Sequence, residues 1–253
     1  MTIENFQLQG QVALVTGCNT GLGQGMALAL AQAGADIVGV NLSDPAETKQ
    51  VIEAAGRRFW DLRANLSDTA CLEGVVQQAI EFAGKIDILV NNAGIIRRTD
   101  AIDFSEKDWD DVMNLNLKNV FFLAQGVAKQ FIKQGTGGKI INIASMLSFQ
   151  GGVRVPSYTA SKSGVMGVTR AMANEWAAHG INVNAIAPGY MATDNTTAVR
   201  ADEARNAAIL ERIPAARWGL PSDLAGPVVC LASKASDYVN GYTIAVDGGW
   251  LAR

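Results

Sequence analysis

The stretch Val12-Ala-Leu-Val-Thr-Gly-Cys-Asn-Thr-Gly-Leu-Gly23 joins a short apolar run to a glycine-rich loop, and a helical pattern follows at once. Glycine permits the tight turn and the close backbone approach that a phosphate needs. The free N–H groups and the dipole at a helix N-terminus attract the same negative charge. Strand, glycine loop and helix in this order therefore predict a dinucleotide-binding unit. The loop residues expected to contact the dinucleotide are Gly17, Asn19, Thr20, Gly21, Leu22 and Gly23.

Outward from this unit, short β-branched runs alternate with longer helical stretches. Strands are expected at Val12–Val15, Asp36–Val40, Ile86–Val90, Lys139–Ile143, Ile181–Ile186 and Thr243–Val246. Helices are expected at Leu22–Ala33, Ser67–Ala83, Ser105–Gln134, Pro156–His179 and Asp202–Glu211. Apolar strands that alternate with helices are typical of a parallel sheet buried on both faces. The sequence predicts an α/β fold, a single-domain doubly wound parallel sheet of Rossmann type with helices on both faces, over residues 1–253.

The least regular stretch covers residues 189–217, which are polar and carry only a weak helical pattern. Long connections in α/β folds are often functional. We interpret this stretch as a lid over a substrate site, with an ordinary surface excursion as the alternative.

Composition excludes several classes of function. The net charge is −3, from 21 basic and 24 acidic residues that are interspersed, so no basic stripe indicates nucleic acid or a membrane surface. The 25 uncharged residues from Gln11 to Ala35 are interrupted by Gly17, Gly21, Gly23 and Gly25, which argues against a membrane span. Three widely spaced cysteines and a single histidine predict no metal site and a reducing compartment. With no signal-like start, we expect a cytoplasmic protein.

A second motif carries acid/base chemistry. Tyr158 and Lys162 are four residues apart, which places both side chains on one face of a helix. A phenol ordinarily has a pKa of about 10, and a neighbouring ammonium favours the phenolate. The pair is therefore expected to exchange a proton with a substrate near neutral pH. Taken alone, the same spacing also fits a half-buried tyrosine beside a solvated lysine.

The loop spacing T-G-x-x-x-G-x-G differs from the G-x-G-x-x-G of many dehydrogenases and resembles that of the short-chain dehydrogenase/reductase family. The resemblance continues in order along nearly the whole chain. It rests on Asn91-Asn-Ala-Gly94, on Asn116, on Ser145, on Tyr158 with Lys162, on Pro188-Gly189 followed by Thr193, and on Val246-Asp-Gly-Gly249. It implies an oxidoreductase that transfers a hydride between a nicotinamide cofactor and an alcohol or ketone.

The resemblance also implies a role for each of four catalytic residues. Tyr158 would exchange the proton with the substrate oxygen, and Ser145 would hydrogen-bond the same oxygen. Lys162 would lower the pKa of the phenol and hold the nicotinamide ribose, while Asn116 would hold a water that links Lys162 to solvent. Further residues implied to border the cofactor are Asn92, Ala93, Gly94, Pro188, Gly189, Met191 and Thr193.

The choice between the two nicotinamide cofactors rests on the residues after the second strand. Asn41 stands where many NAD-preferring relatives carry aspartate, and an amide bonds a ribose without repelling a 2′-phosphate. Asn65 and Leu66 occupy the place of a pair that contacts adenine. Neither Arg nor Lys occurs at positions 18–20 or 42–43, where a 2′-phosphate would want a cation. We therefore expect NAD(H).

The expected substrate is short, acidic and hydroxylated. Arg97, Arg98 or Arg154 could grip a carboxylate, although each could instead form a surface ion pair. The remaining residues expected to meet substrate are Gln150, Tyr190, Ser148 and Asn195, with Ser145 and Tyr158. Residues 104–116, 143–151, 153–158 and 246–253 are similar to sugar-acid dehydrogenases within the family, which implies a small-molecule keto sugar acid.

Two other functions stay open at this point. A 3-oxoacyl carrier-protein reductase, or another short-chain reductase, would share the catalytic residues but would favour NADPH. A dinucleotide-binding regulator would keep the glycine loop and lose the active-site residues. The family resemblance further implies a homotetramer, assembled through the helix that bears Tyr158 and through the C-terminal strand.

Overall fold

The computed structural model describes residues 3–253. A single seven-stranded sheet lies at the centre of the fold, and every pair of neighbouring strands in it is parallel. The strands are β1 (Val12–Thr16), β2 (Asp36–Asn41), β3 (Phe59–Arg63), β4 (Ile88–Asn91), β5 (Gly138–Ile143), β6 (Ile181–Pro188) and β7 (Thr243–Val246). Their spatial order is β3-β2-β1-β4-β5-β6-β7. The direction of winding reverses between β1 and β4, which is the crevice where doubly wound sheets bind ligands.

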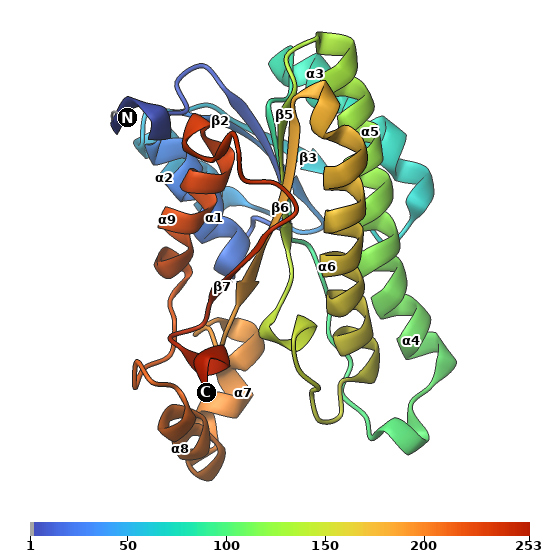
Figure 1. Cartoon of the computed structure of the whole chain (residues 1–253), viewed down its shortest axis with the longest axis vertical. Helices are drawn as coiled ribbons and strands as arrows, with labels where there is room; N and C mark the ends of the chain where they lie inside the picture. Colours follow the sequence, from blue (N-terminus) through green and yellow to red (C-terminus); the bar gives the residue numbers. More distant parts are fainter. Residues whose placement is uncertain (1–2) are drawn as a thin grey trace.

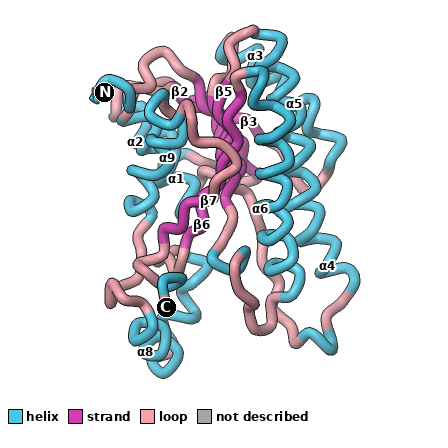
Figure 2. The backbone as a smooth tube through the Cα atoms, in the orientation of Figure 1, coloured by secondary structure: helices cyan, strands magenta, loops and turns pink. Residues whose placement is uncertain are grey.

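Helices cover both faces of the sheet, as Figure 1 shows. The helices are α1 (Gly21–Gln32), α2 (Ala46–Ala54), α3 (Leu72–Ala83), α4 (Glu106–Met113), α5 (Asn119–Gln134), α6 (Pro156–Trp176), α7 (Thr197–Ala201), α8 (Glu203–Arg212) and α9 (Ala225–Ala232). One layer holds α1, α2 and α9, and the other holds α3, α5 and α6 (Figure 2). The short helices α7 and α8 lie beyond the ends of β6 and β7, beside the C-terminus.

Two hydrophobic cores lie on the two faces of the sheet. Along β1, Ala13 and Val15 pack into the core that α1 and α9 cover, while Val12 and Leu14 pack into the core that α3, α5 and α6 cover. Successive side chains of a strand point to opposite faces, so a strand buried on both sides is apolar at every position. The predicted fold class is confirmed, and the uninterrupted apolar runs are its cause.

All six expected strands are present, whereas β3 and the helices α2, α7 and α9 were not predicted. In β3 the charged Asp61 and Arg63 alternate with buried positions, which is the pattern of an edge strand with one wet face. The helix α9 contains Gly226 and Pro227, which are residues that usually argue against a helix. The expected helix Ser105–Gln134 is interrupted by one π-helical turn at Asn114–Lys118.

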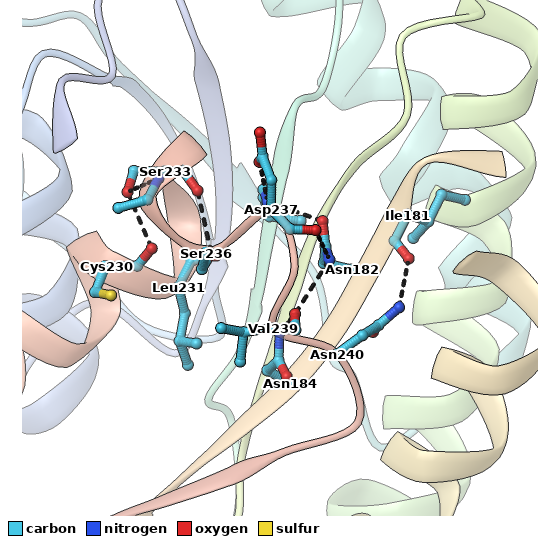
Figure 3. Close-up of polar contacts among 12 residues, drawn as sticks. Ile181, Asn182, Asn184, Cys230, Leu231, Ser233, Ser236, Asp237, Val239 and Asn240 are labelled. Carbon is cyan, nitrogen blue, oxygen red and sulfur yellow. Dashed lines mark hydrogen bonds and ion pairs between the residues drawn. The ribbon is translucent and has the colours of Figure 1, made fainter. Parts of the chain in front are cut away.

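Asparagine side chains join β6 to the segment that leads into the edge strand β7. Asn184 Nδ2 donates to the carbonyl of Val239 at 2.8 Å, and Asn184 Oδ1 accepts from the N–H of Tyr242 at 3.0 Å. Asn240 Oδ1 accepts from the N–H of Val183 at 2.7 Å. Figure 3 shows Asn184 beside Val239, and the bond from Asn240 to the carbonyl of Ile181. Before β7 begins, these side chains add to two backbone bonds, from the N–H of Gly241 to the carbonyl of Val183 at 2.9 Å and from the N–H of Ala185 to the carbonyl of Tyr242 at 2.8 Å. Together the bonds fix the course of the C-terminal residues toward the cleft described below.

Within residues 3–253, no helix is long and apolar enough to cross a membrane.

Candidate active site

A cleft of about 780 Å³ lies at the carboxyl ends of the strands. Its walls come from the glycine loop after β1, from the loops that follow β4, β5 and β6, from residues 189–212, and from Trp250. Parallel strands place the loops after their carboxyl ends at one edge of the sheet, so segments distant in sequence meet there. Every expected cofactor contact except Asn41 lines this cleft.

The glycine loop is shaped for a close approach by a ligand. Gly17 and Gly21 have φ angles of 62° and 59°, in the left-handed region that favours glycine. A Cβ at Gly23 would collide with the carbonyl oxygen of Gly17 and with the amide of Asn92. Asn92 Nδ2 donates to the carbonyls of Thr16 at 3.0 Å and Gly17 at 2.9 Å. The loop is thereby held against β4, and the N-terminus of α1 opens into the cleft.

Asn41 takes a different place from the one expected. Its side chain is buried, and Oδ1 accepts a hydrogen bond from the N–H of Cys18 at 2.8 Å. The cleft is lined there by Leu42 and Ser43, and Asn19 Nδ2 donates to Ser43 Oγ at 2.9 Å. Asn41 therefore supports the glycine loop from below instead of facing a ribose.

The residues at this end of the cleft fit a dinucleotide. The loop offers backbone N–H groups in a cradle that a Cβ at Gly17 would narrow, since it would lie 3.1 Å from Cα of Ala93. Asn65 and Leu66 line the neighbouring wall. The other end is bordered by Pro188, Gly189, Met191 and Thr193.

The π-helical turn between α4 and α5 presents Asn116 to the loop after β4. Asn116 Nδ2 donates to the carbonyl of Ile95 at 2.8 Å, and its Oδ1 accepts from the N–H of Ile95 at 2.9 Å. Asn116 Nδ2 also donates a longer bond of 3.4 Å to Ser161 Oγ on α6. π-helical turns often mark functional sites because they re-aim a side chain. Here the turn lets one buried amide fasten the cleft floor to the helix that carries Tyr158.

Ser145, Tyr158 and Lys162 meet in the middle of the cleft. Ser145 follows the end of β5, and its Oγ accepts from the N–H of Leu147 at 3.1 Å. Tyr158 and Lys162 come from the first turns of α6, and Lys162 Nζ lies 5.6 Å from the centroid of the Tyr158 ring. Lys162 Nζ donates to the carbonyl of Ile143 at 2.6 Å. The loop after β5 and the helix α6 thus bring a hydroxyl, a phenol and an ammonium together.

Burial sets the protonation of this group. It lowers the pKa of Lys162 to about 8, because the ammonium has lost its water. Burial also raises the pKa of Tyr158, against the opposing effects of a hydrogen bond with Ser145 and of the positive charge of Arg98. The Lys162 ammonium lies over the phenol ring and is directed to the carbonyl of Ile143. In the protein alone, Tyr158 therefore holds its proton firmly at neutral pH.

The three arginines that were expected to bind substrate differ in whether they line the cleft. Arg97 does not line the cleft, because its guanidinium pairs with Asp108 at 3.3 Å and with Asp111 at 3.8 Å. Arg98, one residue later, does line it. Arg154 lines it as well, with its Nε 2.9 Å from a carboxylate oxygen of Asp100.

The outer wall of the cleft contains Trp250 and Arg212, which were not expected to meet substrate, beside the expected Tyr190 and Gln150. The ring of Tyr190 packs edge-on against Trp250 at 4.8 Å and against Trp218 at 5.4 Å, measured between ring centroids. Arg212, the last residue of α8, lies with its Cζ 3.9 Å from the centroid of Trp250 and donates from Nη2 to Gln150 Oε1 at 3.2 Å. Sequence alone gave no signal for Arg212, because α8 has the polar composition of a solvated helix.

Among the described residues, no group of three or more His, Cys, Asp and Glu side chains is placed to hold a metal ion.

Comparisons with known proteins agree with this geometry. A family model described as enoyl-(acyl carrier protein) reductase matches residues 17–251. Proteins of Dickeya dadantii (strain 3937) and Escherichia coli (strain K12), both named 2-dehydro-3-deoxy-D-gluconate 5-dehydrogenase, are each 71% identical over 253 residues, which is the full length of both chains. A crystal structure from Agrobacterium tumefaciens, described as a putative 2-deoxy-D-gluconate 3-dehydrogenase with bound NADP, is 56% identical, with a TM-score of 0.93. That comparison covers 98% of this chain and 99% of the other.

The identity over the whole chain and the shared fold confirm the resemblance that the motifs carry. The chain belongs to the short-chain dehydrogenase/reductase family and is an oxidoreductase that works with a nucleotide cofactor.

Proposed function

We propose that this protein interconverts 2-keto-3-deoxy-D-gluconate and 2,5-diketo-3-deoxygluconate with NAD(H), as a step in the breakdown of pectin and uronates. The observation that carries the proposal is the full-length identity of 71% with two proteins named for this activity. The cleft supports it, because Ser145, Tyr158 and Lys162 meet there beside arginine side chains. An alcohol/ketone redox site with cationic walls suits a small hydroxylated acid.

A nicotinamide held in the cleft would supply or accept the hydride, while the protein's own residues transfer the proton and stabilise the charge. Tyr158 Oη holds a proton at neutral pH and gives it to the substrate carbonyl oxygen during reduction. Ser145 Oγ binds the same oxygen and stabilises the negative charge that builds on it. Lys162 keeps a positive charge beside the phenol below a pH of about 8. Asn116 holds the loop after β4 in place beneath these groups.

The preference for NAD(H) over NADP(H) is supported by the adenosine end of the cleft. The residues that line it between Gly17 and Ser67 include neither Arg nor Lys. The nearby cation Arg63 is held by Asp61 at 2.6 Å and by Asp44 at 3.0 Å. A 2′-phosphate would therefore meet hydroxyl and amide groups without a free cation. The structure of the Agrobacterium relative contains NADP, so the preference for NAD(H) has to be tested by comparing NADH and NADPH directly.

The two other functions have less support. A carrier-protein reductase would need room for a long thioester, whereas the outer wall here carries arginines and a row of aromatic rings. A regulator that had lost catalysis would not retain Ser145, Tyr158 and Lys162 in one cleft.

We also propose a cytoplasmic homotetramer, in which the 189–217 segment acts as a lid. Assembly is supported by large apolar side chains that are exposed on the single chain, among them Trp109 and Phe122 beside α6 and Tyr238 and Tyr242 beside β7. Free thiols at all three cysteines suit a reducing compartment. Sedimentation at micromolar concentration checks the assembly, and a species that stays monomeric would contradict it.

The function is tested by following NADH absorbance with purified protein and 2,5-diketo-3-deoxygluconate. Parallel reactions replace NADH by NADPH, or the diketo acid by an acetoacetyl thioester. We expect rapid turnover of the diketo acid with NADH. Turnover of only the thioester with NADPH would leave the family assignment intact and would refute the proposed substrate and cofactor together.

A further inference from the structure

The cleft wall carries four arginines, namely Arg98, Arg154, Arg205 and Arg212. The neighbours of each arginine determine whether its charge is free, and oriented, to bind a ligand. Arg154 already forms an exposed ion pair with the carboxylate of Asp100 at 2.9 Å, which compensates part of its charge. Arg98 acts on Tyr158 through its charge. Arg205 is exposed, and no described side chain orients it.

Arg212 combines a fixed orientation with an uncompensated charge. Its guanidinium stacks on the ring of Trp250 with Cζ 3.9 Å from the centroid, and one Nη2 proton is directed to Gln150 Oε1. A guanidinium carries five N–H donors in a planar fork, so most of its donors stay available. Within residues 3–253, no carboxylate lies within ion-pair distance of it.

The surface beneath Arg212 is rigid. Trp250 is only 5% exposed, and it packs with Met146, Ile209 and Ile213 in a small apolar cluster. Tyr190 braces the same ring from the side. Stacking on a fixed aromatic face restricts the guanidinium plane before a ligand arrives, which lowers the entropy cost of binding.

Gln150 connects Arg212 to the reacting centre. It lies five residues after Ser145, in the loop that begins at the end of β5. The bond of 3.2 Å therefore joins the end of α8, within the 189–217 segment, to the loop that positions the catalytic hydroxyl. An anion bound by Arg212 would be held at a defined place relative to Ser145.

We propose that Arg212 binds the carboxylate of the substrate, with Trp250 orienting its guanidinium and Gln150 tying it to the Ser145 loop. This inference rests on the proposed function and assigns the acid specificity of that site to one residue. It replaces Arg97, which lies outside the cleft, and Arg154, which already has an acidic partner.

The test compares the keto sugar acid with an analogue in which a hydroxymethyl group replaces the carboxylate. For Arg212→Gln, the KM for the acid should rise about 10- to 100-fold, because charge-assisted hydrogen bonds are lost, while kcat and the KM for NADH change little. The KM for the uncharged analogue should not change. Arg212→Lys should recover part of the affinity, since it restores the charge without the planar fork. The matched control is Arg97→Gln, which removes an arginine outside the cleft and should leave every constant unaltered.

The outcomes separate this inference from the proposed function. If the wild-type protein does not turn over the keto acid, the proposed function fails and this inference fails with it. If the wild type does turn it over but Arg212→Gln leaves its KM unchanged, only the role of Arg212 is overturned. Equal losses for the acid and the uncharged analogue would likewise overturn it, since they would indicate a general effect on the cleft wall.

Discussion

Asn41 Oδ1 accepts a hydrogen bond of 2.8 Å from the backbone N–H of Cys18, and this bond supports the glycine loop from the neighbouring strand. Both groups are buried, so neither has water as an alternative partner. Loop residues from Asn19 onward can then face the cleft while Cys18 points into the core. The residue after β2 therefore shapes the cofactor site without standing in it.

Replacing Asn41 with leucine should destabilise the protein by about 1–3 kcal/mol, because the N–H of Cys18 would be buried without a partner. The dissociation constant for NADH should rise as the loop loses its support. Urea unfolding and NADH fluorescence titration measure the two effects. Ser43→Ala, which removes only the exposed bond to Asn19, is the control and should change the free energy of unfolding by less than about 0.5 kcal/mol. Equal effects of both changes would contradict this account.

Cofactor preference should respond to position 43. The side chain of Ser43 lines the cleft, whereas Asn41 is buried, so an arginine is tolerated at 43 and would be disruptive at 41. Ser43→Arg should raise kcat/KM for NADPH relative to NADH by about tenfold or more, because a guanidinium can pair with the 2′-phosphate. The ratio is measured with both cofactors, together with direct NADPH binding by fluorescence. An unchanged ratio would place the 2′-phosphate elsewhere.

The fold and the central chemistry were predictable because their signals are local. Apolar runs such as Lys139–Ile143 specify buried strands, and the glycine loop specifies its own turn. The edge strand β3 was missed because charged residues interrupt its apolar pattern. Side-chain direction in irregular segments was beyond prediction, since Arg97 and Arg98 are adjacent and only the second faces the cleft. Arg212 reaches the site because its guanidinium packs on Trp250 in the folded chain. The two residues are far apart in the sequence, so no local sequence pattern could predict this contact.

Lys162 should lower the stability of the protein without cofactor at neutral pH. Its pKa of about 8 in the folded state lies below the reference value of 10.5, so the unfolded state binds more protons between these values and stability rises with pH there. Below pH 8 the penalty is constant. Lys162→Met should therefore raise stability at pH 7 by on the order of 1–3 kcal/mol, with little gain above pH 10. Thermal unfolding at pH 7 and 9.5 tests this, and a gain that is the same at both values would contradict it. Activity should fall in either case.

The two directions of the reaction should differ in their dependence on pH. Burial raises the pKa of Tyr158, so the phenol stays protonated through neutral pH and can act as an acid. The kcat/KM for reduction should then be flat between pH 6 and 8, whereas oxidation needs the phenolate and should rise by up to about tenfold per pH unit. Tyr158→Phe should lower both by about 10²- to 10⁴-fold. Stopped-flow profiles of both directions give the result, and oxidation that is flat over this range would refute the assignment of Tyr158 as the base.

The amide of Asn184 should be necessary for the course of the C-terminal segment. It is 1% exposed and bonds both Val239 and Tyr242, so Asn184→Ala removes the partner of the Tyr242 N–H, while the Val239 carbonyl keeps the bond that Asn182 Nδ2 donates at 3.1 Å. We expect a loss of about 1–3 kcal/mol, mainly from the unpaired N–H. Hydrogen exchange at the N–H of Tyr242 should accelerate more than exchange in β1, because the effect begins at the edge of the sheet. The control is Asp237→Asn, which removes an exposed ion pair with Lys139 and should cost less than about 1 kcal/mol. If Asn184→Ala costs no more than this control, the backbone ladder of β7 with β6 holds the C-terminus without help from the asparagines.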